Sequence, residues 1–372
     1  MTDFIQLHIL TGYPASNLNR DDLGRPKSMT FGGANRLRVS SQCLKRTART
    51  ARPEPVAIRT KAIGEALKIA FADNFGAKAN DVAERLAEAV AGAIDAKAKK
   101  GKDDGTPGKL LNSTLAFYSK AEFDGLVQLA GSVTPDSNLG AALTIKKPTK
   151  ASAKIIAEAV NETMDNVTRS ADVAMFGRMF AANPKRNVDA AVQVAHAFTV
   201  HEAHVEDDFF TAVDDEKDAN DSRGGGHMGD AGFGSGVFYL YVCINRTELV
   251  KNLAELGDDA ESTADEGIAN LLTALTTYSP SGKQNAFASR ARALHVIAER
   301  GPWQPRSLAM AFLDPVTTSE GHVTGAINRM WSTRGRLNST YGDDPKVFCL
   351  DATGERSGGT LTQMVDFCTG GA

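Results

Sequence analysis

Three stretches of the chain have the residue pattern of β-strands. Residues 4–10 (FIQLHIL) alternate apolar side chains with Gln6 and His8, which predicts a strand with one buried and one exposed face. Residues 237–245 (VFYLYVCIN) are apolar on both faces, which predicts a strand in the centre of a sheet. Residues 172–180 also have strand character, although more weakly.

A further strand leads into a helix with one basic face. Residues 36–40 (RLRVS) alternate, so that Arg36, Arg38 and Ser40 are expected on the exposed face. Ser40 and its neighbour are suited to cap a helix that ends before Pro53. The spacing predicts an inward stripe of Leu44, Ala48 and Ala51 and an outward stripe of Lys45, Arg49 and Arg52.

The rest of the chain mixes helices with loops. Residues 56–170 repeat apolar positions at helical spacing, which predicts a helical insertion. We expect further helices at 188–204, 266–276, 288–299 and 318–333. Together with the strands, this order of elements predicts an α+β fold.

Composition narrows the class of protein. A chain of 372 residues is long for one domain and suggests about two compact units. Its amino end has no signal peptide, and no stretch is apolar enough to cross a bilayer, so we expect a cytoplasmic protein that does not bind membranes. The 4 cysteines lie far apart, which argues against a zinc site or a disulfide framework.

Positive charge is concentrated in one short span of a slightly acidic chain. The chain has 42 Lys and Arg against 45 Asp and Glu, yet residues 39–52 contain several basic side chains and no acid. Most charge runs are solvated helix faces, but those usually contain acidic partners at helical spacing. A basic stripe behind a helix N-terminus suits a polyphosphate backbone, so nucleic-acid binding and a solvated face both remain open on pattern alone.

Two acids at the start of the chain allow an enzymatic alternative. Asp21 and Asp22 could bind metal ions for phosphodiester cleavage. Asp in loops more commonly accepts hydrogen bonds from turn amides, and no further acid lies nearby in the sequence. We therefore favour a turn.

An aromatic pair stands out in an acidic segment. Phe209 and Phe210 lie between acids and a glycine-rich stretch, 222–236. Aromatic side chains at the tip of a loop can stack on bases or wedge between them, whereas the ordinary alternative is that the rings pack against the domain.

Other motifs carry no chemistry. His196, His201 and His204 lie on the helix expected at 188–204, but their spacing is not that of a metalloprotease. Cys43 has no visible histidine partner, so a peptidase is discounted. We expect no metal and no cofactor.

Several segments together resemble a known family. "FIQLHIL", "SNLNRDD", "FGGANRLRVSSQCLKRTAR", "GRMF", "HAFTVHEAHVEDDFFTAVDD" and "SGVFYLYVCIN" resemble, in this order, the CasC-type backbone subunit of the type I-E Cascade complex, a CRISPR effector. Residues 25–45 and 196–245 are the specific part of the match. One departure is Arg49, where a lysine would be expected.

The resemblance implies a fold shaped like a right hand. Its palm is a modified RRM (ferredoxin-like) domain, its fingers are the helical insertion and its thumb is a β-hairpin. Carried onto this chain, the parts are palm 1–55, fingers 56–170, palm 171–204, thumb 205–236 and palm 237–372.

The resemblance also implies which residues touch nucleic acid. For the RNA backbone these are Arg20, Lys27, Arg38, Ser40, Gln42, Lys45 and Arg49, with Lys283 and Gln284 as weaker candidates. For a wedge at a displaced nucleotide they are Met179, Phe209, Phe210 and Thr211. For weaker contact with target DNA they are Lys146, Lys147, Lys150 and Lys154.

The function implied is structural and not catalytic. Copies of the chain would oligomerise along a CRISPR guide RNA and, with other Cascade subunits, form a complex that recognises complementary target DNA in antiviral defence. Base sequence would be read by Watson–Crick pairing of the guide, so the protein needs only backbone and shape contacts. The alternative is a metal-dependent endoribonuclease that uses Asp21 and Asp22.

Overall fold

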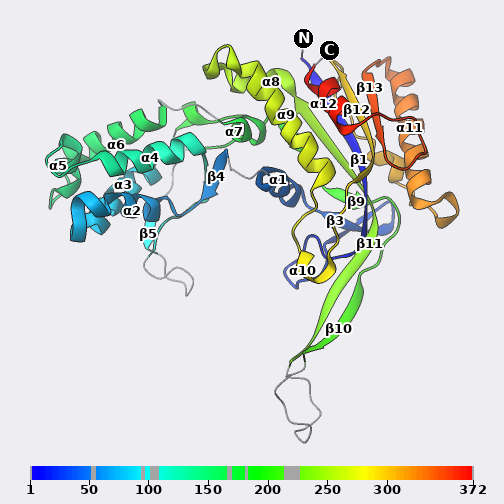
Figure 1. Ribbon diagram of the computed structural model, residues 1–372, viewed down its shortest axis with the longest axis horizontal. Helices are drawn as coiled ribbons and strands as arrows, with labels where there is room; N and C mark the ends of the chain where they lie inside the picture. The colour runs from blue at the N-terminus through cyan, green and yellow to red at the C-terminus, as the bar shows by residue number, and fades with distance from the viewer. Residues whose placement is uncertain are drawn as a thin grey trace, which may run out of the picture. The chain divides into compact units, whose positions relative to one another are not determined.

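The chain forms two compact units. A computed structural model describes residues 2–51, 56–93, 97–100, 109–165, 170–180, 183–212 and 227–370. Unit 1 comprises Met1–Pro53, Val192–Thr247 and Ile268–Ala372, and unit 2 comprises Glu54–Ala191 and Glu248–Gly267 (Figure 1). Unit 2 therefore extends past the helical insertion expected at 56–170.

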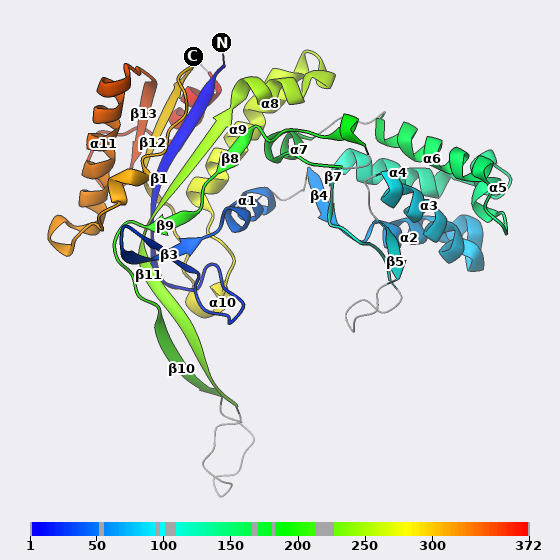
Figure 2. The same cartoon turned by 180° about the vertical axis from the view of Figure 1, so that it is seen from behind.

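Unit 1 is built on an antiparallel sheet of nine strands (Figures 1 and 2). Its spatial order is β13 (Lys346–Asp351), β12 (Ala293–Gly301), β1 (Phe4–Ser16), β11 (His227–Asn245), β9 (Ala197–Thr199), β3 (Ala34–Val39) and β2 (Ser28–Phe31). Two further strands, β8 (Val192–Val194) and β10 (Glu206–Ala212), also pair with β11. The prediction of a central strand at 237–245 is confirmed, since β11 pairs with β1 on one side and with β8 and β9 on the other.

Helices of unit 1 flank this sheet. They are α1 (Ser41–Thr50), α10 (Gln284–Phe287), α11 (His322–Tyr341) and α12 (Leu361–Thr369), with the short 3-10 helices η4 (Ala309–Phe312) and η5 (Thr318–Glu320). An apolar cluster joins Tyr239 and Ile297 of the sheet to Phe312 of η4 and Met330 of α11. No helix in the described ranges is long and apolar enough to cross a membrane.

Strand β1 is buried on both faces, which corrects the half-buried prediction. Gln6 and His8 are as inaccessible as their apolar neighbours. The His8 ring lies between Tyr239 and Glu299: its Nδ1 is 3.0 Å from the tyrosine hydroxyl and its Nε2 is 3.3 Å from the carboxylate. Arg306 donates to the same carboxylate at 2.7 Å. Polar side chains can therefore line a buried face when they satisfy one another.

Unit 2 is mainly helical, as the apolar spacing predicts. Its core includes Phe71, Leu86, Leu126 and Val160 from four helices. The α-helices within 54–191 are α2 (Ile63–Phe75), α3 (Ala79–Ala93), α4 (Lys120–Ser132), α5 (Asn138–Thr144), α6 (Lys150–Asp165) and α7 (Ala171–Phe176), with 3-10 turns η1 (Gly76–Lys78) and η2 (Pro184–Arg186). The strand pairs are β4 (Ala57–Thr60) with β7 (Ala116–Ser119), and β5 (Ala98–Lys100) with β6 (Leu110–Asn112). The segment Glu248–Gly267 of unit 2 contains most of α8 (Arg246–Asn252), η3 (Ala254–Leu256) and the first part of α9 (Asp259–Thr277), whose remainder belongs to unit 1.

Three assignments of secondary structure from the sequence are wrong. The strand expected at 172–180 is α7, which Ser170 caps and whose residues 171–175 are all buried, so it shows no amphipathic spacing. The helix expected at 188–204 is replaced by β8 and β9, and the helix expected at 288–299 contains the start of β12. These strands are rich in β-branched and apolar residues that pack within the sheet, and tertiary contacts override the weak local helical pattern.

Candidate nucleic-acid interface

Helix α1 is basic, as the sequence predicts, but its exposed cation is Arg46 and not Lys45 or Arg49 of the expected outward stripe. Ser40, which was expected on an exposed face, is buried. Its hydroxyl caps α1 by accepting a hydrogen bond from the Cys43 amide at 3.3 Å. Leu44 and Ala48 face the core, and Lys45 lies on the half-buried flank. Gln42 and Arg46 are exposed and Arg49 is half-buried, while Arg52 lies outside the described residues. The helix contains no acidic residue, so its accessible face is of one sign.

Arg36 does not lie on an exposed face of β3, which corrects the prediction from the alternating pattern. Its side chain is fully buried, and its guanidinium donates to the carbonyl oxygens of Thr199 at 3.0 Å and Phe312 at 2.9 Å. Arg38, two residues further, is half-buried and lies 2.8 Å from Nδ1 of the exposed His196. The sheet is thus covered at Arg36, which joins β3 to β9 and η4, and is partly accessible at Arg38.

The segment before β2 is held against α1 by backbone contacts. The Asn19 side chain accepts a hydrogen bond from the Ser40 amide at 2.9 Å, and the Lys27 amide donates to the Asn19 carbonyl at 2.8 Å. Lys27 is half-buried and Arg20 is exposed, so both basic residues are fixed beside the helix.

Asp21 closes a turn, as the favoured interpretation predicts. Its Oδ1 accepts hydrogen bonds from the amides of Leu23 at 3.0 Å and Arg25 at 2.9 Å. Asp22 is exposed. Within the part of the chain that the structure describes, no group of three or more His, Cys, Asp or Glu side chains could hold a metal ion.

A groove of about 570 Å³ runs beside α1. Its walls are the 18–21 segment, the accessible face of α1 and the loop that follows α9. Three arginines from these three segments line it, namely Arg20, Arg46 and Arg290, together with Tyr278. Sequence reasoning missed Arg46, Arg290 and Tyr278 as site residues, because the last two lie more than two hundred positions from α1 along the chain.

Lys283 and Gln284 lie in that loop and have different environments. Lys283 is exposed and has a left-handed backbone conformation with φ 51°. The Gln284 amide donates to the carbonyl oxygens of Pro280 at 2.8 Å and Ser289 at 3.3 Å. Gln284 therefore braces the loop, while Lys283 extends from it.

The hairpin of β10 and β11 continues the central strand away from the sheet (Figure 2). Phe209 is 67% exposed and Phe210 is 41% exposed. Because successive residues of a strand point to opposite faces, the two rings lie on different faces of the hairpin. Thr211, which is exposed, pairs with Met228. The acid-rich stretch 214–221 lies outside the described residues.

Met228 joins one of these faces. It lies opposite Thr211 in the register, while Phe209 lies opposite Asp230, so Met228 shares the face of Phe209. Its side chain is 63% exposed. On the other face Phe210 lies over Gly229, where an added Cβ would come within 2.7 Å of the ring. No pattern in the sequence points to Met228, because only the strand register places it beside Phe209.

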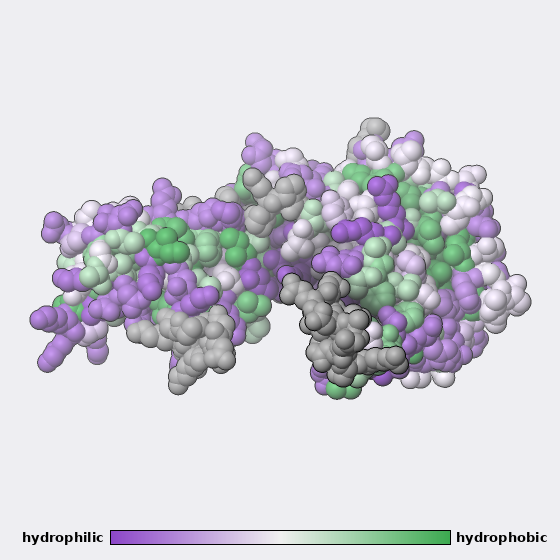
Figure 3. Space-filling model, turned by 60° about the horizontal axis from the view of Figure 1, so that its bottom comes forward, coloured by the Kyte–Doolittle hydropathy of each residue, from purple (hydrophilic) through white to green (hydrophobic). Residues whose placement is uncertain are grey.

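The remaining predicted contacts belong to unit 2. Met179 is exposed in the turn after α7, where Arg178 donates to the buried Glu122 at 2.6 Å. Lys146, Lys147, Lys150 and Lys154 are all exposed. On the face in Figure 3, hydrophilic side chains cover much of unit 2, with patches of apolar surface between them.

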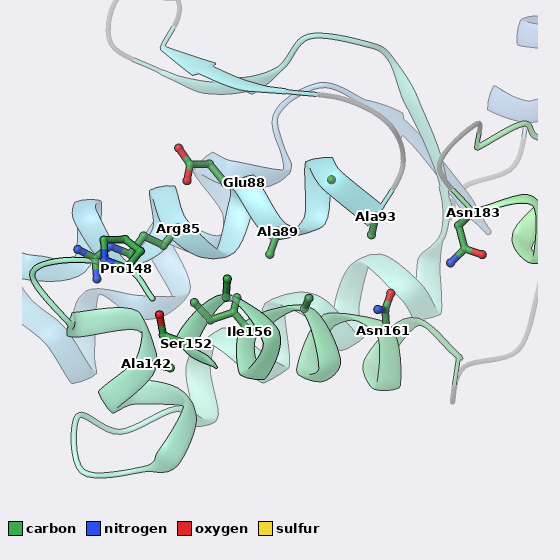
Figure 4. A pocket seen from close by; sticks show the side chains of 13 residues that line it. Arg85, Glu88, Ala89, Ala93, Ala142, Pro148, Ser152, Ile156, Asn161 and Asn183 are labelled. Carbon is green, nitrogen blue, oxygen red and sulfur yellow. The ribbon is translucent and has the colours of Figure 1, made fainter. Parts of the chain in front are cut away.

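A cavity of about 440 Å³ lies between α3 and α6 of unit 2. Figure 4 shows Ala89 and Ala93 of α3 pointing toward Ile156 of α6. Asn161 and Asn183 line one end of it. Lys150 and Lys154 of α6 are not among the residues that line this cavity, and Lys154 lies 3.6 Å from the Glu158 carboxylate.

The three histidines of 188–204 and the four cysteines have different surroundings. None of the three histidines lies on a helix, since 188–204 holds short strands. The His201 ring accepts from the Val237 amide at 3.2 Å and stacks on His322 with centroids 4.1 Å apart. Burial lowers the pKa of His201 and raises the pKa of the Cys43 thiol. All four cysteines are free.

Comparison with known proteins agrees with this architecture. A solved structure described as "CRISPR RNA-guided surveillance complex, pre-nicking" contains a chain that matches with a TM-score of 0.82 and 32% identity, over 99% of this chain and 100% of that one. A second, described as "CRISPR RNA-guided surveillance complex", matches with a TM-score of 0.73 and 27% identity over the same shares. No curated protein sequence matches significantly.

These matches define the structural class. The chain has the α+β fold of those two chains over almost its whole length. It belongs to the family described as CT1975-like protein, which matches residues 5–366.

Proposed function

We propose that this chain is the RNA-binding backbone subunit of a Cascade-type CRISPR complex of type I-E. Unit 1 then corresponds to the palm, the inserted helices to the fingers and the β10–β11 hairpin to the thumb. The observation that carries the proposal is the accessible face of α1, which contains basic residues and no acid, beside a groove lined by three arginines. Similarity to chains of RNA-guided surveillance complexes supports it.

Guide RNA binds along the basic groove in this proposal. Arg20 lines this groove, whereas Lys27, Arg38, Lys45 and Arg49 lie outside its lining. In the proposal these five side chains neutralise successive phosphates, which is the main source of affinity for a single strand. Ser40 and Gln42 offer polar groups at the N-terminus of α1, where a helix attracts anions. Lys283 is exposed on the loop after α9, outside the lining of the groove, and is a further candidate for contact with the RNA. The protein makes no contact that depends on base identity, because the guide reads its target by pairing.

In this proposal the β10–β11 hairpin inserts between nucleotides of the guide RNA that the groove holds. Its exposed Phe209 stacks on a base, Thr211 contacts a neighbouring nucleotide from the same face, and Phe210 does so from the other face. Met179, which is exposed on unit 2, is a separate candidate for contact with a nucleotide. Target and guide therefore pair in short segments, and the exposed lysines of unit 2 attract target DNA. Further copies of the chain continue the groove along the RNA. Other Cascade subunits complete the complex. We propose that the complex acts in the cytoplasm.

The subunit is not an enzyme in this proposal. The Asp21 carboxylate already bonds two turn amides, which supports a structural role for it. The test is incubation of complementary RNA with the assembled complex and Mg²⁺. We expect intact RNA, and cleavage that disappears in Asp22→Ala would overturn the non-catalytic assignment in favour of the endoribonuclease alternative.

Co-purification tests the RNA-binding role itself. We expect the chain, expressed with its complex, to retain small RNA of uniform length and to lose it when Lys45 and Arg49 are both changed to alanine. Lys346→Ala, a change of an exposed lysine on β13, is the matched control and should retain the RNA. A chain that purifies as a monomer without RNA would contradict the proposal.

A further inference from the structure

An exposed aromatic ring lines the groove beside α1. Tyr278 follows the last turn of α9, where its amide donates to the Ala274 carbonyl at 3.0 Å. Its side chain is 49% exposed and lines the same 570 Å³ groove as Arg20, Arg46 and Arg290. In the described residues Tyr278 takes part in no ring–ring or cation–π contact, so no other ring or guanidinium is stacked on it.

The charged groups around this ring suit a phosphate. Arg20, Arg46 and Arg290 are exposed, and no carboxylate of the described residues lies within ion-pair distance of any of them. Asp21 also lines the groove, but its Oδ1 is already bonded to two turn amides. Guanidinium groups beside an aromatic ring are the combination by which proteins hold single-stranded nucleic acid, with phosphates on the cations and a base on the ring.

The loop from 279 to 291 holds Tyr278 and Arg290 in place, since these residues lie at its two ends. Its two ends are joined where the Ala291 amide donates to the Ser279 hydroxyl at 2.8 Å. In the middle, Gly282 lies so close to the 18–21 segment that an added Cβ would come within 2.4 Å of the Leu18 carbonyl oxygen. Lys283 and Ala288 have φ of 51° and 47°, a left-handed conformation that non-glycine residues rarely adopt. Strained backbone of this kind is concentrated at functional sites.

We propose that the groove holds a nucleobase of the bound RNA stacked on Tyr278, with the adjoining phosphate paired to Arg46 and Arg290. The inference rests on the proposed RNA-binding function and adds a base site to a groove otherwise assigned only to the sugar–phosphate chain. The base is recognised by its aromatic face, so the site accepts any base. It lies apart from the hairpin, whose exposed rings are on β10.

Binding of short single-stranded RNA to the full chain tests the inference. Tyr278→Ala should weaken binding by about 5- to 150-fold, the range expected when one stacked base is removed, whereas Tyr278→Phe keeps the ring and should change binding by less than about twofold. The slope of log affinity against log salt concentration should stay unchanged in Tyr278→Ala. In Arg290→Ala it should become less steep by about 0.7, because one phosphate contact is lost. Tyr341→Ala removes another exposed tyrosine and is the matched control.

An abasic probe separates base stacking from charge. RNA that lacks bases but keeps the ribose–phosphate chain should bind the wild type and Tyr278→Ala about equally, since neither can stack on it. Wild-type binding of ordinary RNA with no loss in Tyr278→Ala would overturn this inference and leave the proposed function standing. No RNA binding by the wild type would overturn both.

Photo-cross-linking tests the base site on the wild-type chain, without any substitution. Ordinary RNA that carries 4-thiouridine should, when irradiated on the wild-type chain, form an adduct at Tyr278 that peptide mass spectrometry locates. Adducts confined to the β10–β11 hairpin would overturn the site.

Discussion

Phe209 and Phe210 are neighbours in the chain but lie on opposite faces of the β10–β11 hairpin. Phe209 shares its face with Met228, and Phe210 lies over Gly229. The pair therefore does not act as one wedge. Each ring can meet only the nucleotide on its own side, so the two faces can be tested separately.

Single alanine substitutions should distinguish the two rings. We expect Phe209→Ala to weaken target pairing by about 1–3 kcal/mol, because it removes one stacking interaction with a base. Met228→Ala should produce a smaller loss in the same assay and should not add fully to Phe209→Ala, since the two side chains share a face. The measurement is the affinity of the assembled complex for complementary DNA. Leu23→Ala, which removes another exposed apolar side chain, is the control.

The melting temperature of Phe209→Ala tests whether the ring belongs to the core of the protein. The exposed Phe209 ring should contribute little to folding, so the melting temperature of Phe209→Ala should stay within a few degrees of the wild type. A large drop would place the ring in the core, and an unchanged affinity for target would remove it from the interface.

Arg36 should stabilise the fold and leave RNA binding alone. Arg36→Met deprives two buried carbonyl oxygens, of Thr199 and Phe312, of their donors, so we expect the free energy of unfolding in urea to fall by about 1–3 kcal/mol. The exposed Arg20 provides the reciprocal control: Arg20→Met should change that free energy by less than about 0.5 kcal/mol but should reduce RNA binding. Equal stability of Arg36→Met and wild type would contradict the buried role.

Buried histidines should make the protein less stable in mild acid. Burial lowers the pKa of His8 from its usual value, although the hydrogen bond to Glu299 opposes this. Burial also lowers the pKa of His295. The unfolded chain takes up these protons near pH 6.5 and the folded chain does not, so stability is lost as the pH falls below about 6.5, by up to about 1.4 kcal/mol per pH unit for each histidine.

Urea unfolding at about pH 7.5 and about pH 5.5 checks this pH dependence. Burial alone would raise the pKa of Glu299, but hydrogen bonds from His8 and Arg306 lower it below its usual range, so this carboxylate stays charged in the window. His8→Gln should show a shallower dependence than the wild type because one proton-binding group is gone. Equal stability of the wild type at the two pH values would contradict the expectation.

The sequence predicted the parts of the molecule that local pattern controls. The apolar run of β11 identified the central strand, and the 3.6-residue spacing of α1 separated Leu44 and Ala48 from the basic face. Both follow from side-chain periodicity alone. The helical character of most of unit 2 was predictable for the same reason.

The errors about exposure arise where a second layer of the fold covers a polar residue. Gln6, His8 and Arg36 occupy positions that alternation assigns to solvent, but α11 and η4 cover that face, and each side chain finds a partner there. A lone sequence does not show that second layer. The groove residues Tyr278 and Arg290 were missed for a related reason, since only tertiary structure brings them beside α1.

The salt dependence of RNA binding tests the central claim most directly. That claim is that α1 binds the sugar–phosphate chain through Lys45 and Arg49. In the full chain, changing both residues to alanine should weaken binding of single-stranded RNA and make the plot of log affinity against log salt less steep by about 1.4, because each phosphate that a cation no longer neutralises reduces the slope by about 0.7. Lys346→Ala should leave the slope as it is. A double variant with the wild-type slope would contradict the account.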